Sequence, residues 1–159
     1  MIEALLGAIV GAIVSFILPY LVEWLKLSRT TGIDGIWISI WEVNSLDGPE
    51  WVSEKVRISQ HFGKLKFVNS ENNRGFTWSG FGRLINKRYI IGEWSETRPG
   101  AHSSGVFVFT ISAAGNSLYG NALGTNIGNV EGSRWILGRS ESDLEFGKRL
   151  LGVESSVKL

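Results

Sequence analysis

The chain has 159 residues, of which 16 are basic and 15 acidic, so its net charge attracts neither DNA nor RNA and we expect no direct binding to either. It contains no cysteine, which excludes a disulfide framework and thiolate metal sites. Seven Trp, eight Phe and three Tyr predict a core or pocket built on large rings, and 20 Gly with only three Pro fit many short strands and tight turns.

An uncharged apolar run covers residues 4–22. At 1.5 Å of rise per residue, a helix of this length just spans a hydrocarbon core about 30 Å thick. The run is long and has an acidic start, which favours a membrane anchor over a cleavable signal peptide. Basic residues follow the run, at Lys26 and Arg29, so the positive-inside rule predicts a single-pass protein with its C-terminal domain in the cytoplasm. We assign residues 1–29 to the anchor and its juxtamembrane segment.

Small residues recur at every fourth position within the apolar run, at Gly7, Gly11 and Ser15. In a helix this spacing places them on one face, where they allow two helices to approach closely enough for backbone packing. We therefore expect the transmembrane helix to self-associate and the protein to be a homo-oligomer.

From Gly32 onward, short alternating runs are separated by turn residues, which is typical of a β-meander. Eight strands on short connections predict an all-β fold, a small antiparallel up-and-down barrel of lipocalin-like form, because closing the sheet removes exposed edges. We expect this barrel to occupy residues 30–140. The expected strands are 36–43, 52–59, 65–69, 76–84, 89–95, 106–112, 117–123 and 134–139.

Two further patterns refine this picture. Residues 141–159 form a C-terminal tail in which Ser140 and Asp143 have the spacing of a helix start, although Gly147 opposes a helix there. Glycines inside strands weaken them unless the strand bends or another group approaches the backbone, and a tightly curved barrel requires such bends. The glycines concerned are Gly80, Gly82, Gly92, Gly120 and Gly138.

The sequence shows no catalytic constellation. His61 and His102 lie in separate predicted turns without metal-ligand spacing, and no phosphate-binding glycine loop or nucleophile elbow is present. We therefore expect a binding protein rather than an enzyme, with no metal and no cofactor.

A flat anionic ligand requires aromatic faces for stacking and guanidinium groups for phosphate. The candidates are Trp41, Trp78, Trp94, Tyr89 and Tyr119 for stacking, Arg83 and Arg98 for phosphate, and Asn121 for base edges. The tryptophans have a second interpretation as core-filling residues. Arg98 is the strongest single candidate, because the loop 97–105 would lie at a barrel mouth. Arg139, by contrast, is expected to stack over Trp37 and close the barrel base.

Basic residues are concentrated in residues 55–88, which contain eight Lys and Arg residues and one acidic residue, Glu71. Two interpretations remain open for this stretch. It is either the solvated outer face of several strands, or a region that attracts an anionic ligand or lipid headgroups.

The segment Gly35-Ile36-Trp37 at the first strand, together with Arg139 at the last, resembles the start and end of lipocalin-type barrels. Combined with the N-terminal anchor and the closing residues 132–139, the whole chain resembles the transmembrane β-barrel effectors of bacterial CBASS anti-phage systems, the CD-NTase-associated protein 15 family. That family usually has two transmembrane helices, whereas one is predicted here.

The resemblance implies that the barrel binds a cyclic dinucleotide second messenger, oligomerises and disrupts the bacterial inner membrane. Three alternatives remain open. The protein could be an effector that a cyclic nucleotide holds inactive until a phage depletes it, or a membrane-tethered lipocalin-like carrier of a hydrophobic ligand. It could also be an assembly protein whose barrel only bridges partners.

Overall fold

The protein divides into two compact units, Met1–Thr30 and Thr31–Leu159. In the first unit, a helix covers residues 11–22. Among the described residues, no helix has the length and hydropathy needed to cross a membrane; the first part of the predicted anchor lies outside them. The computed structural model describes residues 11–22, 32–45, 48–61, 63–72, 75–126 and 129–153.

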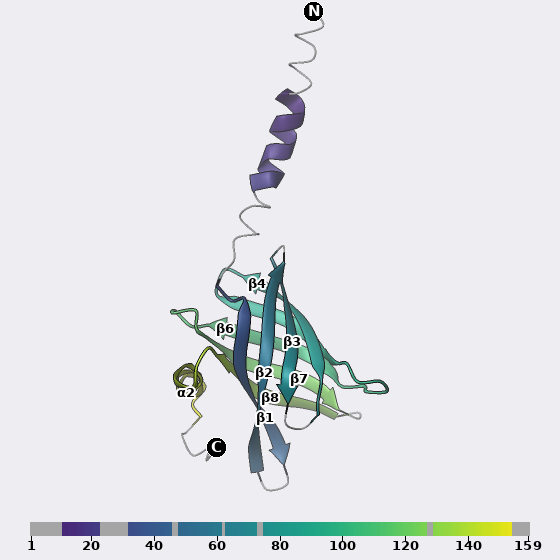
Figure 1. Ribbon diagram of the computed structural model, residues 1–159, viewed down its shortest axis with the longest axis vertical. Helices are drawn as coiled ribbons and strands as arrows, with labels where there is room; N and C mark the ends of the chain where they lie inside the picture. The colour runs from purple at the N-terminus through teal and green to yellow at the C-terminus, as the bar shows by residue number, and fades with distance from the viewer. Residues whose placement is uncertain are drawn as a thin grey trace, which may run out of the picture. The chain divides into compact units, whose positions relative to one another are not determined.

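The second unit is a closed antiparallel barrel in which each strand pairs with the next and β8 returns to β1 (Figure 1). The predicted eight-stranded up-and-down barrel is thereby confirmed. Two hairpins are longer than the sequence predicts, because β2 and β8 each begin several residues earlier than expected. The strands are β1 (Gly35–Ser45), β2 (Gly48–His61), β3 (Lys64–Asn72), β4 (Trp78–Ile85), β5 (Tyr89–Glu96), β6 (Ser104–Ile111), β7 (Ser117–Asn126) and β8 (Asn129–Gly138).

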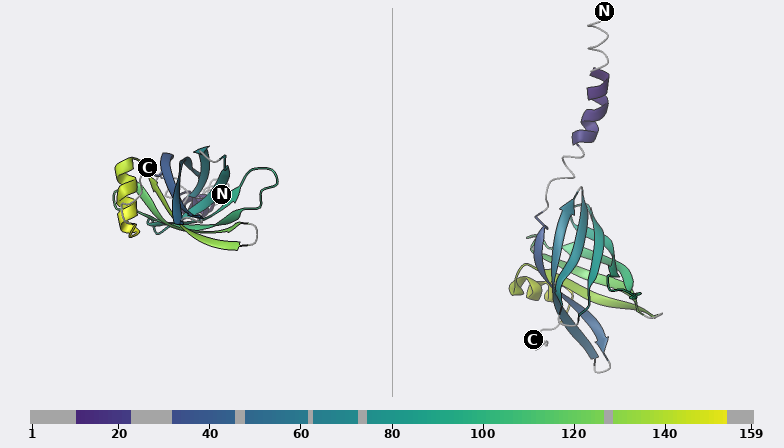
Figure 2. Two further views of the ribbon diagram at one scale, coloured as in Figure 1. Left: turned by 90° about the horizontal axis from the view of Figure 1, so that it is seen from below. Right: turned by 45° about the vertical axis from the view of Figure 1, so that its right-hand side comes forward.

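β1 pairs with β8 only over residues 38–41, whereas β7 and β8 pair along their whole length. Beyond Trp41, β1 pairs with β2 alone, and this two-stranded hairpin extends past the barrel wall (Figure 2). The two strands that close the barrel therefore separate toward one end, which leaves that end wider than the other.

Interior glycines let neighbouring strands approach closely, as the sequence predicts. A Cβ on Gly92 would lie 2.3 Å from the carbonyl oxygen of Phe81 and 2.4 Å from Cζ of Phe107. A Cβ on Gly120 would lie 1.9 Å from the carbonyl oxygen of Val108. No side chain fits at these distances, so the glycines are where the sheet curves tightly and where large rings fill the interior.

The narrow end of the barrel is filled by a cluster of aromatic rings. Phe107 lies at the centre of this cluster, with ring centroids 5.1 Å from Phe67, 5.0 Å from Phe109 and 5.8 Å from Trp135. All three contacts are tilted or edge-to-face, the arrangement that aromatic quadrupoles favour. Because these rings are almost completely buried, they form the core on which the wider end is built.

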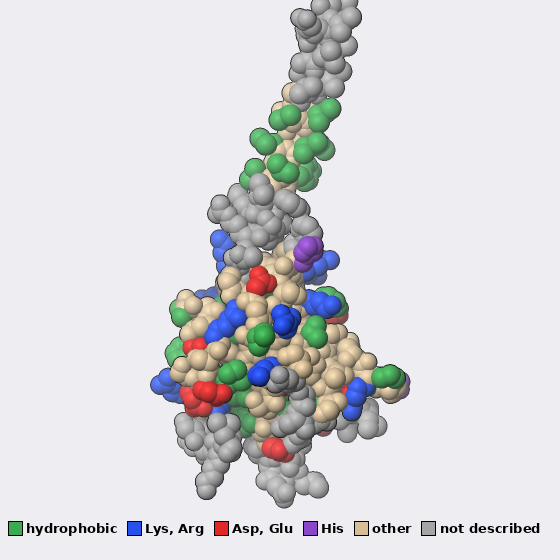
Figure 3. Space-filling model, in the orientation of Figure 1, with side chains coloured by type: hydrophobic (Ala, Val, Ile, Leu, Met, Phe, Trp, Pro, Cys, Tyr) green, Lys and Arg blue, Asp and Glu red, His purple; other side chains and the backbone are tan. Residues whose placement is uncertain are grey.

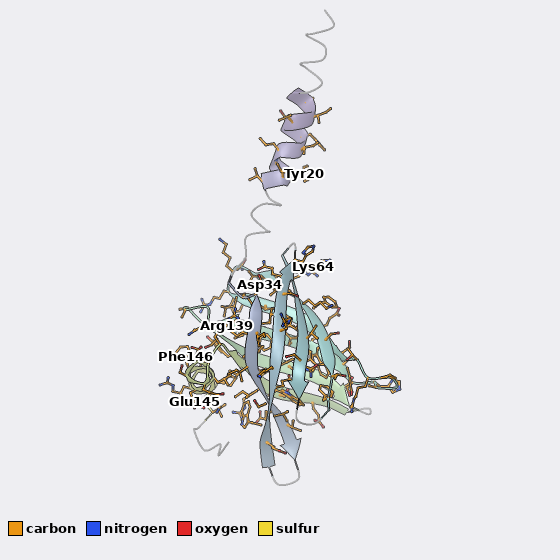
Figure 4. All side chains as sticks on the ribbon, in the orientation of Figure 1. Tyr20, Asp34, Lys64, Arg139, Glu145 and Phe146 are labelled. Atoms are coloured by element: carbon orange, nitrogen blue, oxygen red, sulfur yellow. The ribbon has the colours of Figure 1, made fainter. Side chains whose placement is uncertain are left out.

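Arg139 closes the narrow end, as the sequence predicts. Its guanidinium lies 4.1 Å from the ring centroid of the fully buried Trp37 and donates to the carbonyl oxygens of Gly32 and Asp34. Figure 4 shows Arg139 and Asp34 at this end. Burial lowers the pKa of Arg139, and the charge of Asp34 opposes that effect. The cation–π contact therefore ties the start of β1 to the end of β8.

The helix α2 (Glu141–Leu150) begins at Ser140, whose side chain accepts a hydrogen bond from the backbone N–H of Asp143 as the spacing predicts. Leu144 packs on Ile136 of β8 on the outside of the barrel. A Cβ on Gly147 would lie 2.5 Å from Cγ2 of Ile136. The glycine that opposes helix formation in the sequence is thus the residue that lets the helix lie close to the barrel.

We expect Gly92→Ala to lower the free energy of unfolding by about 1–3 kcal/mol, because the added methyl group collides with backbone and with the ring of Phe107. Gly132→Ala is the matched control. Its Cβ would meet nothing closer than 3.6 Å, so stability should change by about 0.5 kcal/mol or less. Denaturant unfolding of both variants measures the difference, and equal stabilities would contradict a requirement for glycine at 92.

Candidate ligand-binding site

The wider end of the barrel contains a cavity of about 690 Å³. Its floor is formed by Trp78 and Trp135, whose ring centroids are 5.0 Å apart at 71°. The end of β1, the loop 97–103 and the facing ends of β7 and β8 surround it. The lining side chains that could define a ligand are Trp41, Phe76, Trp78, Trp94, Glu96, Arg98 and Trp135.

Three rings form a continuous aromatic wall along this cavity. The centroid of Phe76 lies 5.9 Å from that of Trp41 and 6.2 Å from that of Trp94. The indole of Trp94 lies over the neighbouring strands β6 and β7, which have glycines at that place: a Cβ on Gly105 or Gly124 would lie 2.7 Å or less from the indole ring. The wall can therefore offer aromatic faces to a flat ligand.

The four cavity tryptophans differ in how their indole N–H groups are satisfied. Trp78 donates to the buried carboxylate of Glu54 at 3.0 Å, and Trp135 donates to the hydroxyl of Ser39 at 2.7 Å. The Nε1 atoms of Trp41 and Trp94 are buried without a hydrogen-bond partner among the described residues. Because an unsatisfied buried donor destabilises a protein, these two N–H groups are the unusual feature of the cavity wall.

Arg98 lies at the mouth of the cavity but is already paired. It forms an ion pair with Glu96, whose side chain is only 4 % exposed, and its guanidinium lies 5.8 Å from the centroid of Phe76. Glu42 and Glu131 also line the cavity. The mouth therefore has more carboxylates than guanidinium groups, and an anionic ligand must compete with Glu96 for Arg98.

An ion pair bridges the two strands where they separate. Arg134 of β8 donates through Nε and Nη2 to both carboxylate oxygens of Glu42 on β1, at 2.8 and 2.5 Å. The guanidinium also lies 5.7 Å from the ring centroid of Trp51. The hydrogen bonds and the charge of Arg134 lower the pKa of Glu42 below its usual 4.5, against the opposing effect of burial. This bidentate pair holds β1 beside β8 beyond the last backbone pairing.

The structure brings together four of the eight predicted ligand residues: Trp41, Trp78, Trp94 and Arg98. The prediction that Arg83 and Tyr89 line a ligand site is corrected, because both side chains are exposed on the outer face of the barrel. The physical reason is the two-residue period of a strand. On β4, Arg83 comes five positions after Trp78, so the two side chains lie on opposite faces of the sheet. On β5, Tyr89 comes five positions before Trp94, and the same holds for that pair.

The same prediction for Tyr119 and Asn121 is corrected for the same reason. On β7 the buried hydrophobic side chains are those of Leu118 and Ala122, so the odd-numbered residues between them point outward. Tyr119 packs against the cluster beneath α2, and Asn121 is exposed. Neither lines the cavity.

Sequence reasoning missed Phe76, Trp135 and the carboxylates of the mouth. The position of Phe76, two residues before the candidate Trp78, was a usable signal, because residues two apart share a face of the sheet. Trp135 likewise has the same parity as Leu137 on β8, which is fully buried. The same signal applies to Glu96, two residues after the candidate Trp94, whereas no local signal identified Glu42 as a cavity residue.

The remaining candidates lie elsewhere. Gly11 and Ser15 are exposed on the N-terminal helix, four residues apart, and Gly7 lies outside the described residues. His102 is exposed at the cavity mouth, and His61 is exposed at the β2–β3 turn. Within the described part of the chain, no group of His, Asp and Glu residues is arranged to hold a metal ion.

Comparison with known proteins identifies the fold only. No family model and no curated protein matches the chain. Among solved structures, it is similar to EF1p2_mFAP2b bound to DFHBI, with a TM-score of 0.55 and 12% identity over 72% of this chain and 99% of that one. It is also similar to the redesigned β-barrel mFAP1 bound to DFHBI, with a TM-score of 0.55 and 14% identity over 70% of this chain and 100% of the other. A third, the redesigned β-barrel b11L5F_LGL, has a TM-score of 0.53 and 10% identity over 71% and 96% of the two chains.

We expect Glu42→Gln to lower the free energy of unfolding by roughly 1 kcal/mol at neutral pH, since it removes the charge that Arg134 pairs with. The folded-state pKa of Glu42 lies below 4.5, so the stabilisation is complete above pH 4.5 and is lost as the pH falls through the folded value. The stability gap between wild type and variant should therefore close in acid. Denaturant unfolding from pH 7 downward measures it.

Glu131→Gln serves as the control for this experiment, because Glu131 is an exposed cavity carboxylate with no ion pair among the described residues. Its stability should match wild type at each pH. A gap for Glu42→Gln that persists unchanged in acid would contradict the assignment of the stabilisation to the ion pair.

Proposed function

We propose that this protein is a membrane-tethered sensor whose barrel binds one flat organic molecule in the aromatic cavity. The carrying observation is the wall of Trp41, Phe76 and Trp94, whose rings line the cavity and which has two buried N–H donors without partners among the described residues. The cavity volume of about 690 Å³ lies within the range of known small-molecule sites, roughly 300–1,000 Å³. Two of the similar barrels are themselves described as bound to DFHBI, so a barrel of this form can hold a small ligand.

A cyclic dinucleotide is the first ligand to consider, as the resemblance to CBASS effectors implies. Its bases would stack on the aromatic wall, and acceptor atoms on the bases would satisfy the N–H groups of Trp41 and Trp94. Its phosphates would bind the guanidinium of Arg98 in place of the carboxylate of Glu96 at the mouth. This exchange makes the affinity depend on how strongly Glu96 holds Arg98.

The charge of the mouth favours a second candidate, a neutral hydrophobic ligand. Three carboxylates line the cavity, those of Glu42, Glu96 and Glu131. Arginines pair with the first two, so among the described residues the carboxylate of Glu131 is the excess charge, which disfavours phosphate and is indifferent to an uncharged molecule. In this case the protein would be a membrane-tethered carrier. The two candidates make different predictions for a substitution of Glu96.

For output, we propose that the apolar segment 4–22 spans the bacterial inner membrane and that ligand binding changes the association of these helices. A ligand can shift the equilibrium only by its differential affinity for the two states. A ligand that prefers the oligomer would activate membrane disruption during phage infection. A ligand that prefers the monomer would hold the protein silent until a phage depletes it.

We expect calorimetry of the full chain in lipid nanodiscs to detect binding from a panel of cyclic dinucleotides. Trp94→Ala should weaken it about ten- to a hundred-fold, since loss of a stacking ring has that effect. Arg98→Ala should weaken it about ten-fold through the lost phosphate contact. Arg83→Ala is the matched control, because Arg83 is exposed on the outer face, and it should bind as wild type does.

Glu96→Gln then separates the two ligand classes. Freeing Arg98 and removing one carboxylate should tighten binding of a cyclic dinucleotide and leave binding of an uncharged long-chain alcohol unchanged. Binding of the long-chain alcohol without any nucleotide binding would favour the carrier over the sensor. Failure of every ligand in both classes would exclude the cavity as the functional site.

We expect the double variant Gly7→Ile, Gly11→Ile to abolish toxicity in bacteria while leaving ligand affinity unchanged, because bulky side chains on the small-residue face keep the helices apart. Ile13→Phe is the control, since it adds bulk on the opposite face of the same helix. Growth after induced expression measures toxicity. Undiminished toxicity of the double variant would refute clustering through this face.

A further inference from the structure

Four of the eight basic residues in 55–88 lie on three neighbouring strands on the outside of the barrel. Arg57, Lys64, Lys66 and Arg83 occupy outward positions on β2, β3 and β4, and all four are exposed. The register sets Lys64 directly opposite Arg83. Figure 3 shows that Lys and Arg outnumber Asp and Glu on the face that carries β2 and β3. We name these four residues the basic face.

None of the four cations has a hydrogen bond or an ion pair within the described residues. The arginines of the cavity end, Arg98 and Arg134, are by contrast paired with carboxylates. Like charges set opposite one another on neighbouring strands repel and destabilise the sheet. An arrangement of unpaired cations that the fold does not use is therefore suited to an external anionic partner.

Exposed apolar side chains lie next to the basic face. Phe81, Ile85 and Tyr89 are 52%, 40% and 37% exposed, on the outer positions of β4 and the start of β5. Arg88 lies 5.7 Å from the ring centroid of Tyr89. Cations interleaved with aromatic and aliphatic groups match a lipid headgroup region, where the charges meet phosphates and the apolar groups enter the acyl boundary.

The position of this surface in the barrel points to the same partner. The chain enters the barrel just before Gly35, which pairs with Ile58 close to the β2–β3 turn. Lys64 and Arg83 lie at that same end, and the carboxylates of the cavity mouth lie at the other. Only residues 23–31 separate the apolar segment from the barrel, a reach of about 30 Å at roughly 3.5 Å per residue.

We propose that the basic face docks on an anionic lipid surface and turns the cavity mouth away from the bilayer. The inference rests on the proposed membrane anchor, which delivers the barrel to the surface, but not on the identity of the cavity ligand. Each cation near an anionic bilayer strengthens such docking about five-fold, and the attraction extends only over the Debye length, about 10 Å at 0.1 M salt. Four cations on one face are enough for stable orientation and few enough for salt to reverse it.

The absence of cysteine from the chain allows a direct test by single labels. Ser59→Cys places a fluorophore on the basic face, opposite Lys66 on the neighbouring strand. Ser104→Cys places it at the cavity end, on the first residue of β6. Both serines are exposed. The full chain is inserted into vesicles of phosphatidylcholine, with or without about one third phosphatidylglycerol, that contain headgroup spin-labelled lipid as quencher.

We expect the Ser59 label to be quenched on the anionic vesicles and the Ser104 label to be much less affected. The quenching should fall on neutral vesicles and in 1 M salt, where the Debye length is about 3 Å. Lys64→Gln with Lys66→Gln should lower the ratio of docked to free barrels about 25-fold, five-fold per cation. Arg149→Gln is the control on α2 and should leave the ratio unchanged.

Three results would overturn the proposal: no quenching at Ser59, equal quenching of the two labels, or quenching that neither lipid charge nor the Lys64 and Lys66 changes affect. Failure of the chain to insert into vesicles would instead refute the anchor on which the docking depends. Because ligand affinity is measured separately at the cavity, the sensor function and the docking surface can fail independently.

Discussion

The short pairing between β1 and β8 is the constraint on which the rest of the barrel depends. Backbone hydrogen bonds close the sheet only over residues 38–41, and on either side of this seam side chains hold the two strands. At the narrow end, Arg139 stacks on Trp37 and bonds to the carbonyls that precede β1. At the wide end, the Glu42–Arg134 pair holds the strands after they have separated. The cavity exists because closure is complete at one end and partial at the other.

The same geometry divides the aromatic residues into two groups with different consequences. Rings near the closed end pack on one another and are buried, so they stabilise the fold through the area they remove from water. Rings near the open end line the cavity, and two of them have an N–H group without a partner in the part of the chain that the structure describes. Stability and recognition are therefore assigned to successive layers of one barrel, with Trp78 and Trp135 at the boundary between them.

Half of the ligand residues predicted from the sequence line the cavity and half do not, and the alternation of side chains along each strand explains the difference. Trp41, Trp78 and Trp94 share faces with buried neighbours, whereas Arg83, Tyr89, Tyr119 and Asn121 have the opposite parity and point outward. Residue chemistry selected the right types, but position within the pleat decides which side of the barrel each type reaches. Applied to each strand, the parity rule would have removed the four outer residues and added Phe76.

By itself the sequence determined the closed barrel of eight strands, the aromatic interior, the bends at glycine and the capped start of α2, because alternation, turn residues and cap spacing are local properties of the chain. Only the tertiary structure decided that Arg98 is held by Glu96, that Glu42 meets Arg134 across 92 positions, and that Gly147 makes room for Ile136. These contacts depend on the register and stagger with which the sheet closes. A linear pattern does not contain that information, because closure brings together residues whose separation along the chain has no period.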